Sequence, residues 1–230
     1  MAETVRAATA GRAGGTCRVS GETTGMDGSR SPLLRPEWRY VEPTRLDAFR
    51  APEWTLLAQQ RRAFDAQLQA RHALRLLAAS AADPGFGYQV NNYRHCIQAA
   101  TAAMMDGRDE EYVVMALFHD VGFTVCPTSH GAFAATLLSP YISDANRWIL
   151  EHHQIFQAHH CHDHPDEEVD PRARDLWRGH PQFEATAEFV ERYDIATLAP
   201  GLPEAPLEAF EAMVGRVFSR PPRRLPPRED

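Results

Sequence analysis

The chain has 230 residues, and its 24 basic and 31 acidic side chains give a net charge of −7 when histidine is neutral. None of the basic residues is lysine, which excludes Schiff-base chemistry, attachment of pyridoxal phosphate and phosphate-binding loops that need a lysine. The acidic balance argues against a protein that binds nucleic acid by covering its phosphates. A nucleic-acid partner is therefore not expected.

The cysteines and the apolar runs bear on the compartment. The four cysteines contain no Cys-x-x-Cys pair, so we expect reduced thiols rather than a disulfide framework or a zinc ribbon. The first residues carry an early acid, Glu3, and no apolar stretch of the kind found in a signal peptide. The longest apolar run, Val113 to Phe118, is far short of the roughly 20 residues needed to span a bilayer. We expect a soluble, cytoplasmic protein without a membrane partner.

Composition divides the chain into three parts. Residues 1–35 are rich in Gly, Thr, Ser, Ala and Arg without apolar periodicity, and we expect them to be disordered. Residues 221–230 form a proline-rich tail that neither a helix nor a strand accommodates. Between them, residues 36–220 have the length of one domain.

The central part has helical periodicity in chain order. Residues 53–79 carry apolar side chains at three- and four-residue steps and stop before the breaker Asp83-Pro84-Gly85. A second helix is expected over 91–105, before Gly107, and a third over 109–122, with Asp109 as N-cap and Gly122 as C′ residue. Further helices are expected over 131–138, 145–159, 172–177, 182–197 and 207–217. Without an alternating strand pattern or a repeat, the fold class is an all-α bundle.

Histidine is concentrated in one part of the chain: eight of the 11 histidines lie between positions 119 and 164. Neutral imidazole is the commonest protein ligand of transition metals, and Asp or Glu compensates the charge of the ion. The pair His119-Asp120 follows an apolar helix, and a carboxylate at a helix end can bridge two ions. One such pair is weak evidence, but further His and Asp residues occur on successive predicted helices, in the order His95, His119-Asp120, His130, His153, Asp194.

This order resembles the HD-domain superfamily, which is named for its His-Asp pair. Within it, the chain resembles the branch of mixed-valent di-iron oxygenases that contains inositol oxygenase and phosphonate-cleaving oxygenases. The resemblance covers residues 88–194 and is strongest in HCIQAATAAMMDGRDEEYVVMALFHDVG, continuing through SHGAFAATLLSPYIS and ILEHHQIFQ to ERYD. It implies an HD-type helical bundle around a dinuclear metal site.

The resemblance also implies roles for these residues. His95, His119, Asp120 and Asp194 would hold one ion, and Asp120 would bridge to a second ion held by His130 and His153. His119 and Asp120 would be the catalytic pair. The cofactor would be two iron ions, Fe²⁺ and Fe³⁺, with Mn²⁺, Mg²⁺ or another divalent metal as the alternative, and the partners would be O₂ and a small polar substrate oxidised by C–H abstraction.

Two departures from the family concern the substrate. Family lysines one turn after the fourth histidine and one turn after the final aspartate are replaced here by Gln157 and Leu198. The interval from His119 to His130 is also short, which leaves less loop over the second metal. A different substrate is therefore expected.

Neighbouring residues allow alternatives. His152 and His153 point about 100° apart, so only one can face the centre, and the alignment with the family favours His153. Gln157 and His160 share its stripe and are candidates for the pocket wall, with a surface position as the alternative. Arg178, in the turn before the last ligand helix, is a candidate anion clamp in place of lysine, or simply part of a turn.

Two further features have a functional and a plain interpretation. Gln98 lies one turn from His95 and can support it by a hydrogen bond or be an ordinary helix-surface amide. The run His159-His160-Cys161-His162-Asp163-His164 fits no zinc motif well, and an exposed loop is the favoured interpretation.

Three functions remain open at this point. The first is a di-iron oxygenase, the second a metal-dependent phosphohydrolase in which a bridging hydroxide attacks phosphorus, and the third a metal-binding module without turnover. The oligomeric state is not predicted.

Overall fold

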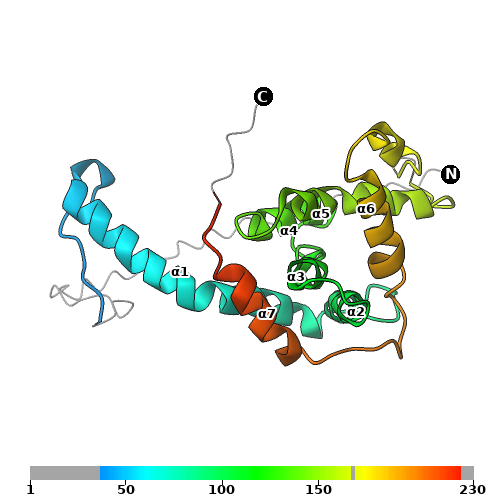
Figure 1. Ribbon diagram of the computed structural model, residues 1–230, viewed down its shortest axis with the longest axis horizontal. Coiled ribbons are helices and arrows are strands. Elements are labelled where there is room, and N and C mark those ends of the chain that lie inside the picture. Colours follow the sequence, from blue (N-terminus) through cyan, green and yellow to red (C-terminus); the bar gives the residue numbers. More distant parts are fainter. Residues whose placement is uncertain (1–36, 167–168, 224–230) are drawn as a thin grey trace, which may run out of the picture. The chain divides into compact units, whose positions relative to one another are not determined.

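A computed structural model describes residues 37–166 and 169–223 (Figure 1). The expected disorder of residues 1–35 and most of the proline-rich tail, from residue 224, lie outside the described residues. The chain divides into two units, residues 1–49 and 50–230. In the first unit the described part, 37–49, contains a short 3-10 helix, Leu46–Ala48, beside an exposed ion pair between Arg45 and Asp47. The predicted domain bounds, 36–220, stay a prediction.

The second unit confirms the all-α class, because its described residues form helices and no strand. The α-helices are α1 (Ala51–Ala79), α2 (Asn92–Met105), α3 (Glu110–Phe118), α4 (His130–Leu138), α5 (Asp144–Gln157), α6 (Phe183–Phe189) and α7 (Glu208–Phe218). Short 3-10 helices lie at Ser80–Ala82, Pro127–Ser129, Ala158–His160 and Ala173–Trp177, and a π-helical turn spans Val190–Asp194.

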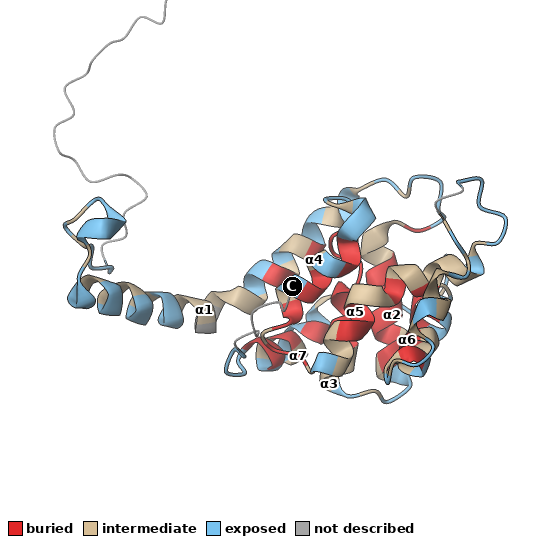
Figure 2. Ribbon diagram, turned by 90° about the horizontal axis from the view of Figure 1, so that it is seen from above, coloured by how far each residue is buried: buried red, intermediate tan, exposed pale blue. Residues whose placement is uncertain are grey.

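Helix α3 is the centre of the bundle. All of its residues from Val113 to Phe118 are buried, as expected of a helix that is apolar all round. α2 and α7 pack against it, while α4 pairs with α5, and α6 packs on α5. Figure 2 shows the buried residues concentrated in these helices; in α1 no residue from Ala51 to Asp65 is buried, and its buried side chains, Ala73 and Leu77, lie near its C-terminal end.

Local signals place most helix ends where the sequence predicts them. Asp109 is the N-cap of α3, since its side chain accepts a hydrogen bond from the Tyr112 backbone. Gly107, after α2, has the left-handed conformation of a C′ residue, with φ of +72°.

The prediction for Gly122 is wrong. α3 ends at Phe118, four residues before it, and Gly122 does not have a positive φ. Its small size matters for a different reason: a Cβ there would lie 2.9 Å from the Cβ of Phe133. The chain turns away from the helix axis after Phe118, which lets α4 come close.

The helix expected over 182–197 changes character midway. α6 ends at Phe189, and the next five residues form the π-helical turn, in which the Ile195 amide donates to the Val190 carbonyl at 2.9 Å. The segment expected as a helix at 172–177 is a 3-10 helix, Ala173–Trp177. A π-helical turn shifts the following side chains around the axis and is often found at functional sites.

One side chain ties three helices together. Glu111, in the first turn of α3, accepts hydrogen bonds from the Ser143 backbone at 2.6 Å, from the Asn146 side chain at 2.8 Å, and from Arg220 after α7. Burial alone would raise the pKa of Glu111, but these donors outweigh it and lower the pKa. The carboxylate is thus stabilised in its charged form by the folded state.

Replacing Glu111 with alanine should lower the free energy of unfolding by about 1–3 kcal/mol, because two partly buried donors and Arg220 lose a charged acceptor. The contribution is present above the ordinary pKa of glutamate and is lost as the pH falls through the lowered folded-state pKa, so the gap between wild type and Glu111→Ala should narrow in acid. Urea denaturation at several pH values measures both effects.

Glu110→Ala is the matched control. Glu110 directly precedes Glu111 in α3, but its carboxylate makes only an exposed ion pair, with Arg216. It should change stability far less than Glu111→Ala. Equal losses in the two variants would show that Glu111 has no special part in joining the helices.

Candidate metal centre

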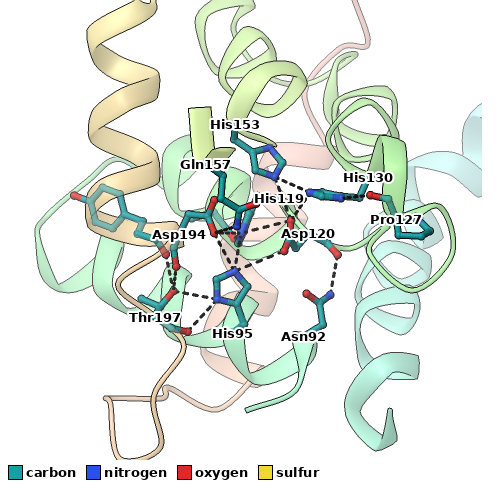
Figure 3. Close-up of polar contacts among 12 residues, drawn as sticks. Asn92, His95, His119, Asp120, Pro127, His130, His153, Gln157, Asp194 and Thr197 are labelled. Carbon is teal, nitrogen blue, oxygen red and sulfur yellow. Dashed lines mark hydrogen bonds and ion pairs between the residues drawn. The ribbon is translucent and has the colours of Figure 1, made fainter. Parts of the chain in front are cut away.

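Six side chains from five parts of the fold converge in the interior (Figure 3). They come from α2, the end of α3, the first residue of α4, the middle of α5 and the π-helical turn, and all are buried: His95, His119, Asp120, His130, His153 and Asp194. These are the six residues that the sequence order singles out.

The first ligand group consists of His95, His119, Asp120 and Asp194. The Nε2 atoms of His95 and His119 lie 3.0 Å apart, and Asp194 Oδ1 lies 3.5 Å from the first and 3.8 Å from the second. Asp120 Oδ2 is 3.7 Å from His95 Nε2. His95, His119 and Asp120 each offer a donor atom close enough to the others to hold one metal ion.

The second ligand group consists of Asp120, His130 and His153. Asp120 Oδ1 lies 3.1 Å from His130 Nε2 and 3.2 Å from His153 Nε2, and the two nitrogens are 3.1 Å apart. These three atoms can also hold an ion. Asp120 belongs to both groups: its Oδ1 faces His130 and His153 and lies 3.8 Å from His119 Nε2, while its Oδ2 faces His95. A carboxylate placed between two groups in this way can bridge two ions.

Backbone carbonyls fix the orientation of all four imidazoles. The Nδ1 atoms of His119, His130 and His153 lie 2.7, 2.8 and 2.8 Å from carbonyls three residues earlier, those of Ala116, Pro127 and Leu150. His95 Nδ1 lies 3.0 Å from the Thr197 carbonyl. A carbonyl can only accept, so each Nδ1 donates its hydrogen, and in the neutral ring Nε2 carries a lone pair directed at the cluster.

Positive charge at the centre, as a proton on an imidazole or as a metal ion, suits this arrangement. Two neutral Nε2 atoms cannot hydrogen-bond each other, yet the groups contain such contacts at 3.0 and 3.1 Å. Asp194 Oδ2 is buried and has no hydrogen-bond partner. A cation between these lone pairs satisfies all of them, and imidazole and carboxylate are the ligand types that suit iron, zinc and manganese.

The ionisation of the cluster follows the same logic. Burial lowers the pKa of His95, but its hydrogen bond to Asp194 and the charges of both aspartates outweigh burial and raise the pKa to about 9. Burial raises the pKa of Asp120, but His119, His130 and His153 hold it well below its usual range, and imidazoles likewise lower that of Asp194. Both carboxylates are therefore charged at neutral pH, while His95, with its raised pKa, has to release a proton before it can bind a metal.

A cavity of about 50 Å³ opens beside the cluster. His95, Asp120 and Gln157 line it on the cluster side, and Phe86 and Tyr88 are among the residues on the other side. Gln157, a predicted pocket residue, extends its amide nitrogen to 3.4 Å from Asp194 Oδ1. His160 does not line this cavity. It lines a wider surface cleft, to which Gln157 also contributes.

The structure does not bring Arg178, the candidate anion clamp, to the cluster and favours its alternative role as part of a turn. The Arg178 side chain is 66% exposed, and its guanidinium pairs with Asp175 at 2.9 Å one turn earlier and lies over the Phe183 ring. The short 3-10 helix that precedes it supplies Asp175 as a local partner and keeps the arginine at the surface.

The choice between adjacent histidines agrees with the geometry. His153 faces the cluster. The His152 ring stacks on Trp148 with centroids 3.8 Å apart, and His152 Nδ1 lies 2.9 Å from the Trp148 carbonyl. Gln98 does not support His95: its amide nitrogen donates to Ala199 and Glu204 instead, and it is buried rather than on the helix surface. The His159–His164 run forms no metal-binding group among the described residues.

Two supporting residues have no signal in the sequence. Thr197 contacts His95 Nδ1 with its main-chain carbonyl at 3.0 Å and with its hydroxyl at 3.2 Å, although it lies 102 residues later in the chain. Asn92 donates from its side chain to the Asp120 carbonyl at 2.8 Å and steadies the turn that carries the bridging carboxylate. Both contacts join residues that are distant in the chain.

Comparison with known protein families and curated proteins finds no relative of this chain: no protein-family model matches it, and a search of curated proteins finds no match. In the part of the chain that the structure describes, none of the helices combines the length and the apolar character required to cross a membrane. The fold and the site thus define an all-α protein with a buried His/Asp cluster that can hold a metal ion.

Asp120→Asn should remove most of the metal from both groups, because the amide keeps the shape but loses the charge that both positions share. Asp194→Asn should affect only the first ligand group, and His130→Ala only the second. Elemental analysis of purified variants gives the number of ions per chain, and circular dichroism verifies the fold.

Arg178→Ala is the control for these variants, since its side chain is exposed and paired away from the cluster. It should keep the metal content of the wild type. Full metal occupancy in Asp120→Asn would show that this carboxylate does not bridge.

Proposed function

We propose that the protein is a di-iron oxygenase of the HD-domain type that oxidises a small substrate. The observation that supports the proposal is the pair of close Nε2–Nε2 contacts on either side of one carboxylate, Asp120, where each pair could hold one cation. The four imidazoles and two carboxylates of the cluster are ligands that iron accepts in both oxidation states.

The two ligand groups differ in a way that suits oxygenase chemistry. Each group has three side chains that could hold an ion, and the first has Asp194 as an additional neighbour, with Oδ1 3.5 Å from His95 Nε2 and 3.8 Å from His119 Nε2. Fewer protein ligands leave coordination positions free for other molecules. An Fe²⁺/Fe³⁺ pair in these positions would supply the electrons for O₂ activation and C–H abstraction.

The residues of the chain have separate tasks in this proposal. The anchored imidazoles hold their lone pairs in place, so little reorganisation is needed when the ions bind. Gln157, on the cavity wall beside Asp194, would donate a hydrogen bond to an oxygen of the substrate.

The cavity wall favours oxygenase over phosphohydrolase. Among the described residues that line it there is no arginine, and the chain contains no lysine. A phosphate ester would carry its charge into a wall of amides and apolar groups, without the basic side chains that usually bind phosphate.

Reconstitution with iron under anaerobic conditions should load two irons per chain. Partial oxidation should then give the electron paramagnetic resonance signal of a coupled Fe²⁺/Fe³⁺ pair, and substrates should consume O₂. A single iron per chain, or release of phosphate from esters by the Mn²⁺-loaded protein without O₂ uptake, would contradict the proposal.

Gln157→Leu should lower kcat/KM by up to about tenfold, because one neutral hydrogen bond is lost. Metal content should stay at the wild-type level, since the amide is not a ligand in either group. Arg178→Ala, measured in parallel, should have wild-type kcat/KM. A loss of iron in Gln157→Leu would indicate that the amide supports Asp194 rather than the substrate.

A further inference from the structure

Two large aromatic side chains stand exposed at the mouth of the cavity. Phe86 is 67% exposed and Tyr88 59% exposed, and both line the cavity that reaches His95 and Asp120. Rings of this size are normally covered by other side chains. Their position beside the cluster suggests that a bound molecule covers them.

The backbone of this segment is held in an unfavourable conformation. Phe86 has φ of +50°, which is uncommon for any residue other than glycine, asparagine or aspartate. The turn is closed by a hydrogen bond of 2.8 Å from the Tyr88 amide to the Gly85 carbonyl, and a Cβ on Gly85 would lie 2.6 Å from the Tyr88 carbonyl oxygen. Backbone strain of this kind is concentrated at sites that bind ligands.

The rest of the wall is uncharged. Apart from the cluster residues His95 and Asp120, the described lining residues are amides, apolar side chains and a glycine. Phe123 also lines the cavity and makes an edge contact with the ring of His130, with centroids 5.7 Å apart. A charged group placed here would lose water and find no partner of opposite sign.

We propose that the substrate has an oxygen-bearing head, which reaches the metal cluster, and an uncharged apolar tail, which lies against Phe86, Tyr88 and Phe123. This inference rests on the metal-dependent function proposed above. It narrows the small polar substrate expected from the sequence to a small amphiphilic molecule, and it assigns the lip residues Phe86 and Tyr88 to substrate selection.

A series of probes with one metal-binding head separates head from tail. Acetohydroxamate, hexanohydroxamate and the monohydroxamate of adipic acid share the head, and only the last carries a carboxylate tail. Titration calorimetry with the iron-loaded protein under anaerobic conditions gives their affinities. Hexanohydroxamate should bind about 10- to 100-fold more tightly than acetohydroxamate, because its added methylenes leave water. The carboxylate tail should gain less than threefold over acetohydroxamate.

Two lip variants test the assignment of the tail. Tyr88→Ser removes one ring, and Phe86→Gly removes the other while relieving the left-handed backbone. Each should remove most of the advantage of hexanohydroxamate and leave the affinity for acetohydroxamate unchanged. Leu176→Ser is the control, since Leu176 is 87% exposed and outside the described lining of the cavity.

The outcomes distinguish the two proposals. If the iron-loaded protein binds acetohydroxamate but the tails give no gain, or the carboxylate tail gains as much as the apolar one, the inference about the tail is overturned and the metal function stands. If the protein takes up no iron or does not bind the shared head, both proposals are overturned.

Discussion

The carboxylate of Asp120 is the contact on which the interior of this protein depends. It is buried between two pairs of imidazoles, with Oδ1 toward His130 and His153 and Oδ2 toward His95. A carboxylate in this position would be costly without compensating charge, since burial alone strongly favours its neutral form. His119, His130 and His153 reverse that preference by lowering the pKa of Asp120. The helices that carry these imidazoles are therefore coupled to one another through the side chain of Asp120.

The elements around the cluster are held by contacts that reach far from it. Asp194 lies in the π-helical turn, directly after Tyr193. The Tyr193 hydroxyl accepts a hydrogen bond from Arg108 at 2.9 Å and donates one to Asp106 at 2.9 Å. Both partners follow the end of α2, the helix that carries His95. This network fixes the turn against α2, so the first ligand group is assembled by the docking of two distant segments.

The two ligand groups consequently differ in how they are built. His130 and His153 are anchored by carbonyls three residues away, so their rings are oriented by local structure as soon as α4 and α5 form. His95 is anchored by the carbonyl of Thr197, 102 residues later in the chain. Its orientation depends on the closure of the whole bundle. The rings of His119, His130 and His153 are thus oriented by local structure, and that of His95 by the tertiary fold.

The sequence by itself determined the helices and the six ligand candidates. Periodicity, the Asp109 cap and the breaker glycines are local properties, and the His and Asp positions are visible because these residue types are rare in buried helix faces. Only the tertiary structure decided which side chains meet. It brought Asp120 between two histidine pairs, turned Arg178 to the surface through Asp175, and placed Phe86 and Tyr88 at the cavity. Such outcomes depend on contacts between distant residues and on main-chain carbonyls, which residue types and spacing do not encode.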